Sequence, residues 1–165
     1  MRGTSRGLLA LAHAIVRAHP RTEVACFGTR VTPVTRALRA PRTDEALRRA
    51  GEAVADWEGG TRIGDSLKTF LSRSSHRGVA RGAIVVLCSD GLETGDPELL
   101  RAQMERLSRL AHRVVWLNPL ASDPAYEPLA RGMQAALPFI DVFAAGDTLE
   151  SVEAVARELS GRLGR

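Results

Sequence analysis

The stretch AIVVLCSDG, residues 83–91, decides the fold class of this chain. Residues 83–88 are an unbroken apolar run rich in Ile and Val, bounded by Gly82 on one side and by Asp90-Gly91 on the other. A short apolar run between turn residues is typical of a strand that is buried on both faces, as in a parallel sheet. We therefore expect a buried strand here, with Asp90 just beyond its carboxyl end.

The segments around this strand alternate between helical and extended patterns. The expected helices cover residues 7–19, 45–55, 63–72, 97–110 and 149–163, and the expected strands cover residues 23–27, 30–36, 83–88, 113–117 and 139–143. The first two strands are expected to form a hairpin, and Pro33 confines the second of them to an edge. Strands that alternate with helices indicate an α/β fold, with a doubly wound, mostly parallel sheet covered on both faces.

A long stretch between the last two strands carries few regular signals. Residues 118–138 are rich in proline and are expected to be irregular. Leu129, Met133 and Leu137 lie at spacings that indicate packing over the edge of the sheet. The total length of 165 residues suits one domain with a single core, so we expect one domain over residues 1–165.

Composition and charge exclude several classes of protein. The apolar runs are too short to span a bilayer, so we expect a cytoplasmic chain with no membrane span. The net charge is +4, Lys68 is the only lysine, and acidic residues lie among the scattered arginines, so a nucleic-acid partner is not expected. Cys26 and Cys88 both lie in apolar runs, which favours buried thiols without a disulfide.

Two short segments carry oxygen ligands at positions where α/β proteins bind their ligands. Gly59-Gly60-Thr61 enters the helix at 63–72, and Ser89-Asp90-Gly91 follows the buried strand. Helix N-termini and the carboxyl ends of strands are the usual ligand positions in open α/β sheets. A hydroxyl and a carboxylate that converge there suit a hard divalent cation such as Mg²⁺. Taken separately, Thr61 is also explained as a helix cap and Asp90-Gly91 as a turn.

These segments, together with others in the same order, resemble the CoxE-like family of von Willebrand factor A (VWA) domains. The similar segments are CFGTR (26–30), VTRAL (34–38), DWEGGTRIG (56–64), SDG (89–91), VWLNPL (115–120) and YEPLARGM (126–133). The resemblance extends along essentially the whole chain. It implies a VWA or Rossmann-like sheet, and it places Thr61 and Asp90 in the second and third parts of the family's metal-ion-dependent adhesion site (MIDAS).

The chain departs from the family at the first part of that site. VWA domains open with a central strand that ends in Asp-x-Ser-x-Ser, and its two serines are direct metal ligands. No Asp-x-Ser is present here, and the adjacent pair Asp65-Ser66 falls inside a predicted helix. We therefore expect a domain that lacks its first central strand and is truncated at the N-terminus. With those hydroxyl ligands absent, Mg²⁺ or another divalent cation is expected to bind poorly.

The resemblance also implies a function. CoxE-like VWA proteins are similar to proteins encoded beside MoxR-type AAA+ ATPases, and the pairing is implicated in the maturation of metalloenzymes such as carbon monoxide dehydrogenase. This predicts a non-enzymatic adaptor that binds the ATPase or its client metalloenzyme through the metal face. Two alternatives stay open: a metal-free structural interaction domain, and a phosphatase or hydrolase that uses Asp90 on a similar sheet.

Overall fold

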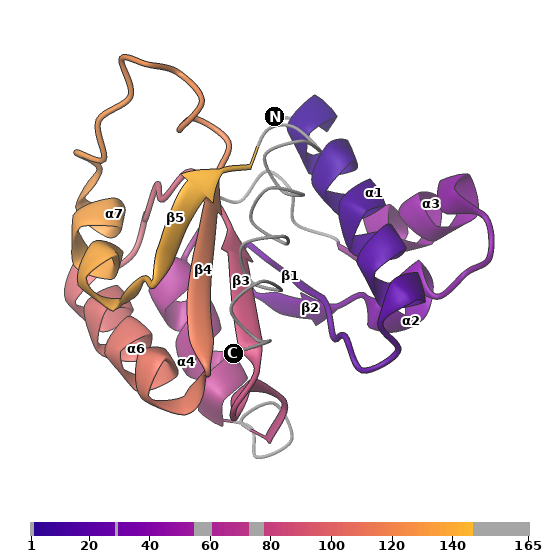
Figure 1. The fold of residues 1–165 in the computed structure, drawn as a ribbon, viewed down its shortest axis with the longest axis horizontal. Coiled ribbons are helices and arrows are strands. Elements are labelled where there is room, and N and C mark those ends of the chain that lie inside the picture. Colours follow the sequence, from indigo (N-terminus) through magenta and orange to yellow (C-terminus); the bar gives the residue numbers. More distant parts are fainter. Residues whose placement is uncertain (1, 29, 55–60, 73–77, 147–165) are drawn as a thin grey trace, which may run out of the picture.

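A computed structural model of the chain describes residues 2–28, 30–54, 61–72 and 78–146. The α/β class with a parallel sheet is confirmed, because strands and helices alternate and helices lie on both sides of the strands (Figure 1). The expected closing helix at 149–163 lies outside the described residues. Within the described residues, no helix combines the length and the apolarity needed to cross a bilayer.

The main sheet contains three parallel strands in the order β3-β4-β5. The elements of this half are α4 (Ile63–Ser72), β3 (Ile84–Cys88), α6 (Pro97–Leu110), β4 (Arg113–Asn118), α7 (Arg131–Ala136), the 3-10 turn η1 (Leu137–Phe139) and β5 (Val142–Ala145). Helices α4, α6 and α7 cover one face, where Trp116 and Met104 belong to a fully buried cluster. Leu11 packs against the other face, beside Val115 and Leu117.

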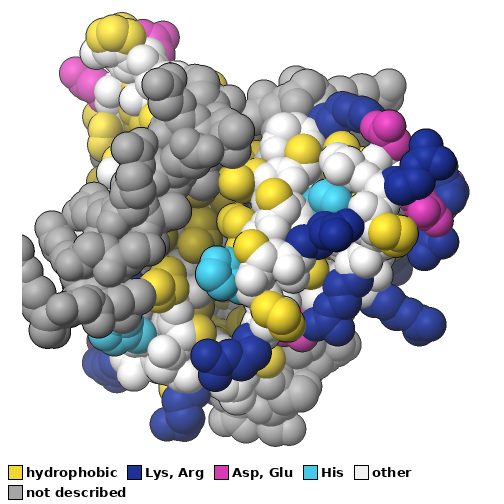
Figure 2. Space-filling model, turned by 45° about the vertical axis from the view of Figure 1, so that its right-hand side comes forward, with side chains coloured by type: hydrophobic (Ala, Val, Ile, Leu, Met, Phe, Trp, Pro, Cys, Tyr) yellow, Lys and Arg dark blue, Asp and Glu magenta, His cyan; other side chains and the backbone are white. Residues whose placement is uncertain are grey.

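The N-terminal half forms a second, smaller unit. It consists of α1 (Arg2–Ala18), β1 (Ala25–Phe27), β2 (Val31–Pro33), α2 (Thr35–Leu38) and α3 (Thr43–Ala53). The expected hairpin is confirmed, since β1 and β2 pair antiparallel in a two-stranded sheet with Ala25 opposite Pro33. Pro33 has no N–H to donate, and it lies on an edge strand, as predicted, since both strands of a two-stranded sheet are edges. Figure 2 shows the outer face of this unit, where arginines lie among acidic residues.

Among the described residues, no strand ladder joins the hairpin to the main sheet. In the VWA strand order that the resemblance implies, the first central strand lies between β1 and β3. No described strand lies between them, and β1 and β3 do not pair directly with each other. One edge of β1 and one edge of β3 therefore have no ladder partner within the described part of the chain.

Two sequence expectations were wrong in the N-terminal half and at β3. Residues 30–36 were expected to be a strand, but the strand ends at Pro33 and α2 begins at Thr35. The hydroxyl of Thr35 accepts the N–H of Val24 at 2.8 Å, so this side chain replaces a ladder bond. The strand over residues 83–88 was expected to be buried on both faces, but Val86 is 46% exposed because β3 is an edge of its sheet.

The stretch 118–138 also differs from the prediction. It contains the helix α7, in which Met133 is fully buried, whereas Leu129 is 66% exposed and does not pack over the sheet. The last strand was expected at residues 139–143, but Phe139 belongs to the 3-10 turn and β5 begins at Val142. The packing of α7 against α6 determines the structure of this region. The spacing of three apolar residues did not predict that packing.

Candidate functional site

The carboxyl ends of β3 and β4 are tied together where the candidate site begins. The N–H of Ser89 donates to the carbonyl of Leu117 at 3.1 Å, and the indole N–H of Trp116 donates to the carbonyl of Ser89 at 2.9 Å. Trp116 is fully buried. The backbone of Ser89 is thus fixed to the neighbouring strand just before Asp90.

Asp90 lies in a tight turn directly after β3 and is half-buried. Its Oδ1 accepts the N–H of Leu92 at 3.0 Å, and the hydroxyl of Ser89 accepts the N–H of Gly91 at 3.1 Å. Gly91 has a φ of +78°, a left-handed conformation that glycine adopts without steric cost. Side-chain oxygens of Ser89 and Asp90 therefore accept hydrogen bonds within the turn itself.

Thr61 lies just ahead of α4 and is bonded to the loop that carries Asp90. Its carbonyl accepts both the N–H and the hydroxyl of Thr94, each at 3.0 Å. On its other side, the N–H of Arg62 donates to the carbonyl of Gly28, the residue after β1, at 3.3 Å. Thr61 and Asp90 thus flank one hydrogen-bonded loop at the same end of the sheet. That their side chains share an ion stays a prediction.

Asn118 and Tyr126 complete this end of the sheet, and the sequence analysis did not single them out. Asn118, at the end of β4, is fully buried; its amide donates to the carbonyl of Asp90 at 3.2 Å and to the hydroxyl of Tyr126 at 2.8 Å. Burial and the negative charge of Asp90 raise the pKa of Tyr126, against the lowering effect of the Asn118 bond. Tyr126 therefore stays protonated beside Asp90.

Glu93 is the other residue that the sequence analysis missed. It is 9% exposed, and its carboxylate joins the loop after β3 to the start of α4. The available sequence signal was weak, since an acidic residue between Gly91 and Gly95 is typical of an exposed turn. Only the approach of two segments distant in the sequence shows that this carboxylate is buried.

The comparison with protein families agrees with this fold and arrangement. The model of the family described as VWA domain containing CoxE-like protein matches residues 1–152. The chain belongs to this CoxE-like VWA family. No curated protein and no solved structure matches it. The family is generally a non-catalytic interaction module.

Thr61 and Asp90 are residue types that bind hard cations, but together they supply few ligands. Thr61 contributes a neutral hydroxyl and Asp90 a carboxylate, which are the oxygen donors that Mg²⁺ prefers. The Oδ1 atom of Asp90 is already engaged by the turn. Among the described residues, no group of three or more His, Cys, Asp or Glu is placed to hold a metal. Any cation at this edge would therefore take most of its ligands from water or from a partner.

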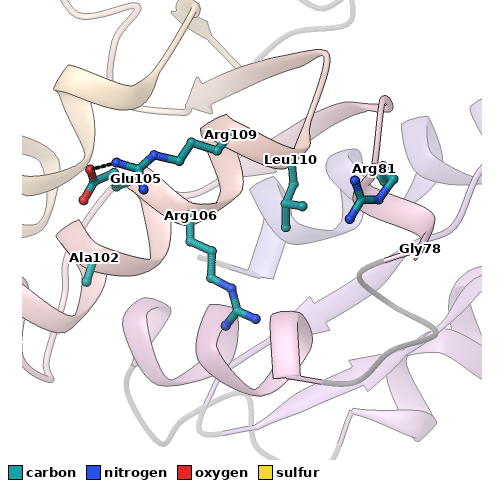
Figure 3. Close-up of a pocket in the computed structure, with 7 residues that line it drawn as sticks. All are labelled: Gly78, Arg81, Ala102, Glu105, Arg106, Arg109 and Leu110. Carbon is teal, nitrogen blue, oxygen red and sulfur yellow. Dashed lines mark hydrogen bonds and ion pairs between the residues drawn. The ribbon is translucent and has the colours of Figure 1, made fainter.

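A hollow of about 500 Å³ lies at the opposite end of this CoxE-like domain (Figure 3). Arg81 precedes β3, while Arg106 and Arg109 lie in the last turns of α6. Arg109 is paired with Glu105, and Arg106 donates to the carbonyl of Leu71 at 3.2 Å. The hollow lies at the amino ends of parallel strands, away from the edge that carries Asp90, and it contributes no ligand to the candidate metal site.

Proposed function

We propose that this CoxE-like VWA chain is a non-enzymatic, cytoplasmic adaptor that works with a MoxR-type AAA+ ATPase in the maturation of a metalloenzyme of the carbon monoxide dehydrogenase type. The observation that supports the proposal most is the match of the family model to residues 1–152, because the resemblance to that family implies the pairing with such ATPases. The contact surface is the end of the sheet that carries Thr61 and Asp90, where a partner carboxylate would meet a divalent cation.

The residues of this edge have separate tasks in the proposal. Asp90 supplies a carboxylate that the turn at Gly91 holds in place, and Thr61, just ahead of α4, supplies a hydroxyl. Tyr126, protonated and bonded to Asn118, offers a neutral polar group beside Asp90. A bound cation would attract an acidic group of the partner. Neutral ligands such as a hydroxyl would leave most of the cation's positive charge uncompensated.

The test is the affinity of the chain for a MoxR-type ATPase from the same genome, measured by calorimetry in Mg²⁺ and in EDTA. Asp90→Ala is expected to weaken binding in Mg²⁺ at least about tenfold. Asp123→Ala is the matched control, because Asp123 also holds an exposed turn, accepting the N–H of Ala125 at 2.9 Å. Failure of the wild-type chain to bind the ATPase in either buffer would contradict the proposed partnership.

A second candidate is an interaction domain that works without metal. It is favoured by the local bonds of Ser89 and Asp90, which use side-chain oxygens that a cation would otherwise take. Binding that is equally tight in EDTA and in Asp90→Ala would support this candidate. The phosphatase alternative is tested with p-nitrophenyl phosphate, and hydrolysis that disappears in Asp90→Ala would support that enzyme instead of an adaptor.

A further inference from the structure

Glu93 connects two segments that carry the candidate metal-face residues. Its Oε2 accepts the N–H of Gly64, in the first turn of α4, at 2.9 Å. Its Oε1 accepts the N–H of Gly95, in its own loop, at 2.6 Å. One carboxylate thus binds the start of the helix that follows Thr61 and the loop that follows Asp90.

The bond to Gly64 answers a requirement of α4 itself. The first N–H groups of a helix have no partner within the helix, and the helix dipole favours negative charge there. Side chains just before a helix usually meet this need, but here the acceptor comes from a loop far along the chain. Because a carboxylate accepts such bonds more strongly than a neutral group, Glu93 holds the two segments together firmly.

Glycines let the backbone close around this carboxylate. A Cβ added at Gly95 would lie 2.9 Å from Oε1 of Glu93, and one at Gly132 would lie 2.7 Å from the Cβ of Glu93 and 2.3 Å from the carbonyl oxygen of Gly91. Real Cβ atoms do not approach neighbours so closely. The loop after β3 is therefore packed against α4 and α7 at a distance that side chains would prevent.

We propose that Glu93 is a positioning residue that sets the separation of Thr61 and Asp90. This inference rests on the proposed function, in which those two residues form the metal face. With the carboxylate in place, Thr94 lies within hydrogen-bond distance of the Thr61 carbonyl, to which it donates twice. Without the carboxylate, only the two bonds from Thr94 to the Thr61 carbonyl join the loop to the start of α4, and the separation of Thr61 and Asp90 is less tightly fixed.

The competing explanation is that Glu93 is only a cap for α4. A cap contributes to the stability of the whole domain, and its loss would raise amide exchange throughout the molecule. The loss of a positioning residue has a local effect. It raises exchange at the two bonded amides, and Thr61 and Asp90 then respond differently to a metal ion. The experiment must therefore compare local and global responses in the same variant.

The test uses the full chain with Glu93→Gln, which removes the charge and replaces one acceptor oxygen by a donor. Glu98→Gln is the matched control, because Glu98 is an exposed residue in the first turn of α6. Exchange at Gly64 and Gly95, measured by NMR, is expected to rise about tenfold or more in Glu93→Gln. Amides of β4 are expected to change by less than about twofold, and the control is expected to change neither set.

A second measurement uses millimolar Mn²⁺ as a paramagnetic probe of the edge. In the wild-type chain, Mn²⁺ is expected to broaden the amide signals at both Thr61 and Asp90; in Glu93→Gln only the Asp90 signals are expected to broaden. If the wild-type chain shows no broadening at either residue, the metal part of the proposed function fails, and the exchange measurement still decides the role of Glu93.

Three results would overturn the inference. The first is unchanged exchange at Gly64 and Gly95 in Glu93→Gln, and the second is a uniform rise in exchange across all amides, which indicates a cap alone. The third is Mn²⁺ broadening of Thr61 and Asp90 together in both chains. If Glu93→Gln does not fold, Glu93→Asp takes its place, because its shorter side chain keeps the charge but cannot reach both amides.

Discussion

Replacing Gly91 by alanine tests the turn that holds Asp90. Gly91 has a φ of +78°, where an L-residue costs about 1–2 kcal/mol. In addition, the new Cβ would lie 2.3 Å from both Cγ and Sδ of Met133. Met133 is fully buried in the main cluster, so it cannot move away without disturbing its neighbours. Overpacking of this kind costs about 1–3 kcal/mol. We expect Gly91→Ala to lower the free energy of unfolding by about 2–5 kcal/mol in total.

Gly82→Ala separates these two contributions. Gly82 has a φ of +69°, but a Cβ there would meet no atom within 4 Å. It should therefore show the backbone cost alone, about 1–2 kcal/mol. A double-mutant cycle gives a second measure: in a Met133→Ala background, Gly91→Ala should cost no more than Gly82→Ala does. The assay is equilibrium urea unfolding followed by circular dichroism.

The reasoning would be refuted by either of two results. One is a loss of stability in Gly91→Ala that does not exceed the loss in Gly82→Ala. The other is strict additivity of Gly91→Ala and Met133→Ala, which would show that residue 91 and Met133 are not in contact. Either result would also contradict the explanation that the turn at Gly91 holds Asp90 in position.

Three further predictions concern the metal, the edges of β1 and β3, and the thiols. The isolated chain is expected to bind Mg²⁺ weakly or not at all, because Thr61 and Asp90 form an incomplete ligand set; stoichiometric micromolar binding in calorimetry that Asp90→Ala abolishes would show otherwise. An N-terminal extension that carries a strand ending in Asp-x-Ser-x-Ser is expected to rescue an otherwise aggregation-prone chain, because the edges of β1 and β3 that lack a ladder partner among the described residues can pair with strands of other chains. A sharp, reversible thermal transition of the 165-residue chain, no lower than that of the extended one, would contradict this. Burial raises the pKa of Cys26 and Cys88 from 9.0 to about 11. Alkylation of these thiols in the folded chain at pH 8 should therefore be about 100-fold slower than in the chain unfolded in urea, and its rate should rise toward pH 11. Equal rates in the folded and unfolded chains would count against buried thiols.

Local patterns in the sequence were sufficient for the elements whose signals lie within a few residues. Helix α4 was predicted with its observed bounds, and α6 begins at Pro97, where the side chain of Asp96 accepts the N–H of Glu98 at 3.0 Å. The parallel strands β3 and β4 were predicted from apolar runs between turn residues. Caps, proline positions and apolar periodicity act through neighbouring residues, so the sequence carries them directly.

The candidate site was predicted in part for the same reason. Thr61 and Asp90 stand out because a hydroxyl at a helix start and a carboxylate at a strand end are local features. Glu93 and Asn118 do not stand out, because an acidic loop residue and a strand-end asparagine are usually exposed. Their roles depend on partners far along the chain, at Gly64 and at Tyr126.

What the sequence alone determined is the α/β class, the order of most elements, the family and the edge where polar residues gather. What only the tertiary structure decided is the environment of individual side chains. Thr35 ends a strand because its hydroxyl meets Val24, and Val86 is exposed because no strand ladder covers that edge of β3 within the described residues. Each of these outcomes depends on which distant segments approach one another, and burial is a property of the whole packed chain.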